Sequence, residues 1–147
     1  GVSQFKSSEA ALELILQYTE PQVSSMLRLG AIRALGRVST GQSQPHVERI
    51  LERLEAISRE PQFTTQMTVI AALGLMEDAG AVTALQGIAT HIDDGRVRRR
   101  AEETVKKVQD KVKKDQAIAQ LQQDFEELKK SNQELKSRLE ELEAKNR

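Results

Sequence analysis

Apolar residues recur with a helical period through most of the chain, in short segments separated by turn signals. Pro21 and Pro61 each end a segment because the residue before a proline is pushed out of the α region, whereas Pro45 suits the first turn of a helix. Gly41 suits a left-handed C-terminal cap and Asp78 an N-cap. No strand pattern competes, so we expect an all-α fold. Its first five helices should span about residues 7–19, 23–38, 45–57, 63–74 and 79–92.

The apolar spacing also predicts which side of each helix is buried. In the first helix the expected buried residues are Ala11, Leu14, Ile15 and Tyr18, with Leu12 and Leu16 alongside. In the third they are Val47, Ile50, Leu51, Leu54 and Ile57, and in the fifth Val82, Leu85, Ile88 and Ile92. A further helix beyond Gly95 has one apolar face, made of Val97, Ala101, Val105, Val108 and Val112.

Parts of the chain resemble one another. Glu20-Pro21-Gln22 recurs as Glu60-Pro61-Gln62, and residues 31–36 recur as residues 69–74, at offsets of 40 and 38 residues. A weaker third copy places Ala101 where Ala31 lies in the first. Helix pairs that repeat at such a period favour an α-solenoid, in which each pair buries its apolar face against the next. The sequence therefore predicts about three stacked helix pairs.

These segments resemble HEAT repeats over roughly residues 7–112. The resemblance is carried by Ala34-Leu35-Gly36, Ala72-Leu73-Gly74 and the junction Asp94-Gly95-Arg96-Val97-Arg98. It implies a short right-handed α-solenoid. The chain departs from the pattern where Thr64-Thr65-Gln66 replaces the charged junction of the second copy, and in the third copy, which lacks the Leu-Gly pair.

From Ile118 onward the apolar period becomes a strict seven, which predicts a coiled coil over four heptads. The predicted seam, which we expect to mediate dimerisation, consists of Ile118, Leu121, Phe125, Leu128, Asn132, Leu135, Leu139 and Leu142. We therefore divide the chain into a helical-repeat domain, residues 1–112, and a C-terminal coiled coil, residues 113–147.

Charges beside the seam bear on the orientation of the two strands. In a parallel dimer Asp124 can reach Lys129 of the partner, and Arg138 can reach Glu143. An antiparallel pair centred near the middle of the seam would instead place Lys129 opposite Lys136. These contacts favour the parallel arrangement.

Asn132 is the one polar residue of the seam, and a buried amide is best satisfied against a matching polar group. It favours a two-stranded parallel homodimer in register. The alternative is a single helix that packs back on its own repeat domain. The Lys-rich segment 113–116 interrupts the apolar stripe, so the last repeat helix either continues into the coil or bends there at a hinge.

The overall charge is zero, but it is unevenly distributed. Up to Gly95 there are 7 basic and 11 acidic residues, and residues 96–116 hold 9 basic and 4 acidic ones. Arg96, Arg98, Arg99 and Arg100 precede the heptads as in a basic zipper that grips DNA. However, the valines of the same helix commit one face to the repeats, so we expect an interdomain or partner contact and no nucleic-acid binding.

Catalytic chemistry has no visible basis in these residues. Cysteine is absent, and the two histidines, His46 and His91, lack a metal-binding spacing. His91 with Asp93 and Asp94 could form a weak metal site, but an aspartate that caps a helix explains the pattern more simply. No nucleophile elbow or phosphate-binding loop is present either. We expect no catalytic, metal or cofactor site.

A short HEAT-like solenoid that leads into a zipper is similar to the C-terminal end of certain bacterial zinc aminopeptidases of the aminopeptidase N (gluzincin) family. That resemblance implies a non-catalytic domain that packs on or caps an upstream catalytic domain. The alternative is a free-standing scaffold that binds a peptide or protein. Without a signal peptide or an apolar run long enough to span a membrane, we expect a cytoplasmic protein, and Gly1 in place of an initiator Met suggests a fragment of a longer chain.

Overall fold

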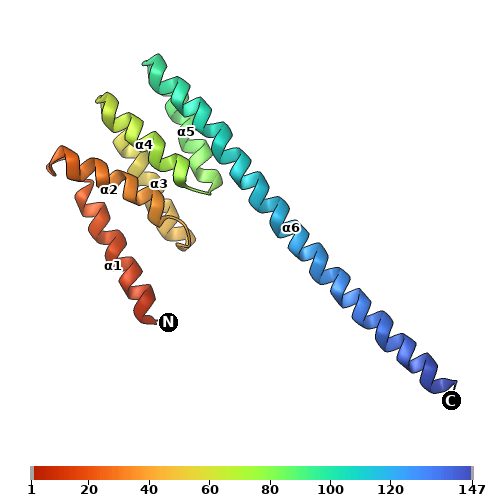
Figure 1. The fold of residues 1–147 in the computed structure, drawn as a ribbon. Helices are drawn as coiled ribbons and strands as arrows, with labels where there is room; N and C mark the ends of the chain where they lie inside the picture. The colour runs from red at the N-terminus through yellow and green to blue at the C-terminus, as the bar shows by residue number, and fades with distance from the viewer. Residues whose placement is uncertain (1, 147) are drawn as a thin grey trace. The chain divides into compact units, whose positions relative to one another are not determined.

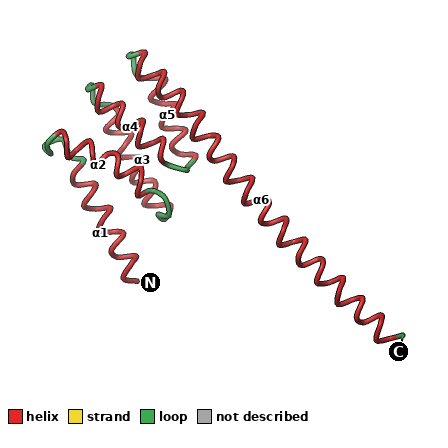
Figure 2. Tube along the Cα trace, viewed as in Figure 1, coloured by secondary structure: helices red, strands yellow, loops and turns green. Residues whose placement is uncertain are grey.

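The computed structural model describes residues 2–146, and side chains from residue 9 onward. All regular structure in this range is helical, which confirms the predicted all-α fold (Figures 1 and 2). Short loops join six helices: α1 (Val2–Tyr18), α2 (Ser25–Val38), α3 (Gln44–Ser58), α4 (Phe63–Leu75), α5 (Ala79–His91) and α6 (Gly95–Lys145).

Local signals account for most of the helix ends. The Asp78 carboxylate accepts a hydrogen bond from the Gly80 backbone N–H at 2.7 Å and so caps α5 as predicted. Pro45 lies in the first turn of α3, where its missing N–H leaves no bond unmade. Gly41 has a φ of +81°, but it lies in the turn beyond α2, which already ends at Val38.

The prediction for the buried side of α1 is right for two of its residues and wrong for others. Leu12 and Leu16 are buried, whereas Leu14 and Tyr18 are 53% and 43% exposed. Apolar residues surround this part of the helix on more than one side, so periodicity alone does not select a face. Packing against α2 selects the stripe that ends at Thr19, whose hydroxyl donates to the Leu16 carbonyl at 2.6 Å.

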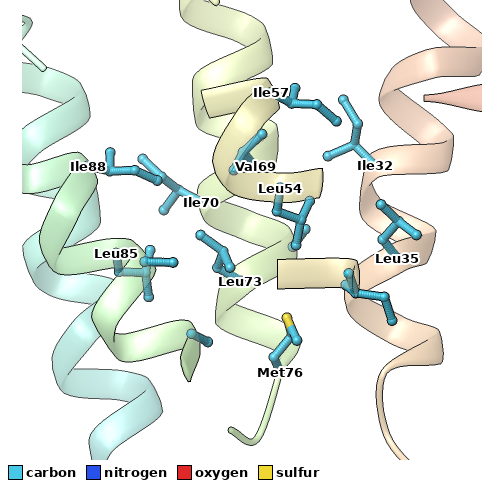
Figure 3. Close-up of a cluster of buried hydrophobic side chains, with 14 of the residues drawn as sticks. Ile32, Leu35, Leu54, Ile57, Val69, Ile70, Leu73, Met76, Leu85 and Ile88 are labelled. Atoms are coloured by element: carbon cyan, nitrogen blue, oxygen red, sulfur yellow. The ribbon is translucent and has the colours of Figure 1, made fainter. Parts of the chain in front are cut away.

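Helices that follow one another in the chain pack as pairs, and each pair also contacts the next. α1 packs against α2 and α3 against α4, while α2 lies beside α4 and α3 beside α5. Figure 3 shows the core that fills the space between them, with side chains from α2, α3, α4 and α5 converging. The α6 residues Val97, Ala101 and Val108 complete this core.

Burial follows the internal repeat. Buried residues of α2 have buried counterparts in α4 that are each 38 positions later. The pairs are Arg28 with Gln66, Ala31 with Val69, Ile32 with Ile70, Leu35 with Leu73, and Gly36 with Gly74. The two helices therefore present the same register of side chains to their surroundings.

The two glycines of the repeated motif lie where neighbouring helices approach most closely. A Cβ atom at Gly36 would overlap the Ala72 carbonyl oxygen of α4 and lie 2.8 Å from the Ala72 Cα. One at Gly74 would lie 2.9 Å from the Thr104 Cγ2 atom of α6. Glycine at position 36 thus sets the spacing between the backbones of α2 and α4.

Arg28 links the first helix pair to the second. Its guanidinium donates two hydrogen bonds to the Glu60 carboxylate, at 2.7 and 2.5 Å, and its Nε donates to the Thr19 carbonyl at 2.8 Å. The Arg28 hydrogen bond holds the pKa of the Glu60 carboxyl below its usual value of 4.5. Gln66, the counterpart of Arg28, donates to the Glu60 backbone carbonyl at 2.8 Å.

Further polar contacts join the same two helix pairs. The Glu13 carboxylate bonds to Arg49 at 2.5 Å and that of Glu20 to Arg53 at 3.1 Å. Glu20 and Glu60 open the two copies of the Glu-Pro-Gln motif, and both pair with an arginine of the other helix pair. The motif thus supplies ion pairs between repeats as well as helix stops.

The chain divides into two compact units, Gly1–Val112 and Lys113–Arg147. α6 includes residues on both sides of this division, so segment 113–116 is helical and not a break in the helix. Buried α6 residues, the last of which is Val108, all belong to the first unit.

Gly36→Ala should destabilise the repeat unit by about 1–3 kcal/mol, because the new methyl group meets the backbone of α4, which cannot move aside cheaply. Gly30→Ala in the same helix is the matched control. Nothing lies within 4 Å of a Cβ atom there, so alanine should stabilise by about 0.5–1 kcal/mol. Urea unfolding monitored by circular dichroism measures both, and equal effects of the two substitutions would contradict the close helix approach.

Glu60→Gln should lower the free energy of unfolding at pH 7 by about 1–2 kcal/mol, between the values for exposed ion pairs and for buried charged hydrogen bonds. Because the folded pKa of Glu60 lies below the unfolded value of 4.5, its contribution is present above that pH and is lost as the pH falls through the folded pKa. The difference between wild type and variant should therefore shrink below about pH 4.5. A difference that is independent of pH would argue against the ion pair.

Candidate functional site

The predicted seam is uncovered in the second unit. The seven apolar members are each 53–69% exposed, and Asn132 is exposed among them. Every described residue from Lys113 onward is exposed. Spacings of three and four residues place the seam on one side of α6, so a continuous apolar stripe faces outward in a single chain.

Charged residues beside the seam are also without ion-pair partners. Among the described residues, Asp124, Lys129, Arg138 and Glu143 form no ion pair within the chain, although Gln120 donates a hydrogen bond to the Asp124 carboxylate at 3.0 Å. These side chains are free to make contacts with a second strand.

The first helix pair also exposes large apolar side chains. Leu14 and Tyr18 of α1 are exposed, and in α2 Met26 is 87% and Leu27 is 59% exposed. Four large apolar side chains with such exposure at one end of the helix series indicate a surface that another element covers. We call these four residues the outer face. Sequence reasoning assigned Leu14 and Tyr18 to the core and so missed it.

Arg96 is engaged within its own unit. Its backbone N–H donates to the Asp94 carboxylate at 2.9 Å, and its guanidinium donates to the same carboxylate at 2.8 Å and lies 4.2 Å from the centroid of the Phe63 ring. The side-chain hydrogen bond from Arg96 lowers the pKa of Asp94. This arginine therefore helps to cap α6, and it is less available to a partner than its neighbours.

The other three arginines of the predicted contact are exposed, but they lie on different sides of α6. Consecutive helical residues differ by about 100° around the axis, so Arg98, Arg99 and Arg100 do not form one patch. Arg100 borders a surface cavity with Arg33 and Arg37 of α2. Those two α2 residues lie more than sixty positions earlier, and no local sequence signal connects them to Arg100.

The candidate metal ligands have separate roles. The His91 Nδ1 atom lies 2.9 Å from the Gly87 carbonyl oxygen, and Asp94 is bonded to Arg96. In the described part of the chain, no group of three or more acidic or histidine side chains is arranged to hold a metal ion. A membrane-spanning helix is likewise absent from residues 2–146.

Neither a scan against protein-family models nor a search of curated proteins finds a match to this chain. The exposed seam, the outer face and the cavity bordered by Arg33, Arg37 and Arg100 are the surfaces that this chain offers to other molecules.

Proposed function

We propose that this chain is a non-catalytic, HEAT-like helical-repeat domain, a short right-handed α-solenoid of three helix pairs that packs on or caps an upstream domain. Its C-terminal residues would form a parallel two-stranded coiled coil that joins two copies. The observation that carries this proposal is the outward-facing apolar stripe of the second unit, in which no described residue is buried.

A second copy of the chain is the occupant that best fits the seam. One position of the heptad, d, is leucine four times in succession, and the other seam position, a, holds Ile118, Phe125, Asn132 and Leu139. This pattern suits two strands, and a parallel pair in register lets the two Asn132 amides meet. The same register brings Asp124 toward the partner's Lys129 and Arg138 toward the partner's Glu143. Exposed leucines at this density are costly in a monomer, so association supplies the missing burial.

The outer face supports contact with an upstream domain. Terminal repeats of a solenoid need a polar outer surface or a covering element, and α1 and α2 present Leu14, Tyr18, Met26 and Leu27 instead. The resemblance noted above suggests that the covering element belongs to a zinc aminopeptidase, in which this domain would border the catalytic domain without contributing catalytic groups. A cytoplasmic location is part of the same proposal.

A free-standing scaffold is the competing function. The observation that favours it is the cavity bordered by arginines from α2 and α6, which does not overlap the seam or the outer face. The two functions differ in what covers the outer face, so the experiments below treat each surface separately.

Light scattering should give a dimer mass for the whole chain and a monomer mass for a chain that ends at Lys114. Leu128→Asp combined with Leu135→Asp should raise the dimer Kd by at least about a hundredfold, because two large apolar side chains per strand lose their burial. Gln123→Asp with Ser137→Asp adds the same charge on the opposite side of the heptads and should leave the dimer intact. Equal masses for all four proteins at micromolar concentration would remove dimerisation from the proposal.

Strand orientation can be read with a single introduced thiol, because the chain has no cysteine. Under mild oxidation, Leu142→Cys should cross-link rapidly in a parallel coil, where the two d positions face each other. Mixing Leu142→Cys with Ile118→Cys should give no preferential heterodimer cross-linking, because these two positions lie at opposite ends of the seam and meet only in an antiparallel pair. Preferential pairing of position 142 with position 118 would show an antiparallel coil instead.

Contact between the outer face and an upstream domain predicts a context-dependent effect of Leu14→Gln with Leu27→Gln. In the isolated chain both side chains are exposed, so the variant should unfold within about 0.5 kcal/mol of wild type. In a longer chain that includes the preceding domain, the same variant should lose more than about 1 kcal/mol per leucine, measured by denaturant unfolding. An equal effect in both chains would count against the covering domain.

A further inference from the structure

The surface formed by α2, α4 and α6 contains a groove within the first unit. It has a volume of about 580 Å³, and α4 provides Met67, Ala71 and Leu75 along it. Arg33 and Arg37 of α2 border one side, and Arg100 and Lys107 of α6 border the other. A second cavity shares Met67 and Arg100 with it, so the hollow continues toward the start of α6. We call this hollow the α2–α4–α6 groove.

The floor of the groove is uncharged because α4 has no charged residue anywhere between Phe63 and Leu75. The buried side of α4 contributes to the core through Val69 and Leu73, while Ala71 on its other side is exposed. A small exposed alanine between bulkier residues leaves room for an apolar side chain from a ligand. The floor can therefore bury apolar groups but offers no counter-charge.

The two sides carry positive charge that is not neutralised. Arg33, Arg37, Arg100 and Lys107 form no ion pair among the described residues, unlike Arg28, Arg49, Arg53 and Arg96, which each have an acidic partner. Glu103 is the single acidic residue that borders the 580 Å³ cavity. Like charges along a concave surface reinforce one another and attract anions from solution.

We propose that the α2–α4–α6 groove binds an acidic, amphipathic peptide segment of a partner protein. The apolar side chains of that segment lie on Met67, Ala71 and Leu75, and its carboxylates face the cations of α2 and α6. The proposal does not depend on dimerisation or on an upstream domain, because the groove uses neither the seam nor the outer face.

A peptide suits this groove better than a nucleic acid. Bases bind to protein mainly by stacking on aromatic rings or by hydrogen bonds to their edges, and no aromatic residue borders the cavity. A phosphate backbone held only by the four cations would leave the apolar floor uncovered. An acidic amphipathic helix or strand satisfies both parts of the surface at once.

Binding can be measured by fluorescence anisotropy with the whole chain and a labelled synthetic peptide that has leucines on one helical face and glutamates beside them. The charge-reversed peptide, with lysine for each glutamate, should not bind. Arg33→Gln with Arg37→Gln should weaken binding of the acidic peptide by about three- to tenfold, as expected for the loss of two partly exposed ion pairs. Glu103→Gln, which removes the acidic residue that borders both cavities, should tighten it.

Two further variants test the location and the role of the floor. Arg98→Gln also removes one positive charge from α6, but Arg98 borders neither cavity. This variant should therefore bind the acidic peptide with an affinity within about twofold of wild type. Ala71→Arg fills the floor while it adds positive charge, and it should abolish peptide binding. Circular dichroism checks that each variant is folded.

The outcomes discriminate between the proposal and its competitors. Failure of the acidic peptide to bind, or equal losses for Arg98→Gln and Arg100→Gln, would overturn the proposal. Unchanged or tighter binding by Ala71→Arg would show that charge alone attracts the peptide and would overturn it as well. Preferential binding of a duplex DNA of similar charge, lost on Arg33→Gln with Arg37→Gln, would assign the groove to nucleic acid instead.

Discussion

The close approach of α2 to α4 is the constraint on which the rest of the repeat unit depends. At Gly36 the two backbones come so near that no side chain fits between them. With this spacing, Ile32 and Leu35 of α2 belong to one continuous core with Val69 and Leu73 of α4. This spacing also leaves α4 in a central position, bordered by α2 and by the first part of α6, which explains why its sequence contains no charge on any side.

Polar contacts add specificity to this apolar packing. Arg28 is largely buried, and its three hydrogen bonds reach both the end of α1 and the loop that follows α3. A guanidinium in that position would be costly without partners, so the Glu60 carboxylate and the Thr19 carbonyl must be in place for the core to close. The ion pairs of Glu13 and Glu20 join the same two helix pairs. The buried residues of α6 are valine, alanine and threonine.

The surface shows the complementary pattern. Cations on the α2, α4 and α6 side lack partners, and the apolar residues of the outer face and of the seam lack cover. The core of the chain does not cover these side chains, and each of the three surfaces suits a different kind of contact. The seam has a regular heptad spacing, which suits a second copy of the same helix. The outer face has no such regular spacing. The groove combines positive charge at its sides with an apolar floor. These differences underlie the separate roles proposed for the three surfaces.

Local sequence was sufficient for features that depend on a few neighbouring residues. Asp78 at a helix start and Pro45 in a first turn both act through short-range sterics or hydrogen bonds, and their placement was predicted. The heptad pattern likewise marks one side of a long helix without reference to the rest of the molecule. Only the tertiary structure decided which side of α1 is buried, because Leu12, Leu14, Leu16 and Tyr18 compete and contact with α2 selects among them. It alone also brought Arg33 and Arg37 opposite Arg100, since a groove between helices far apart in sequence exists only after those helices have packed.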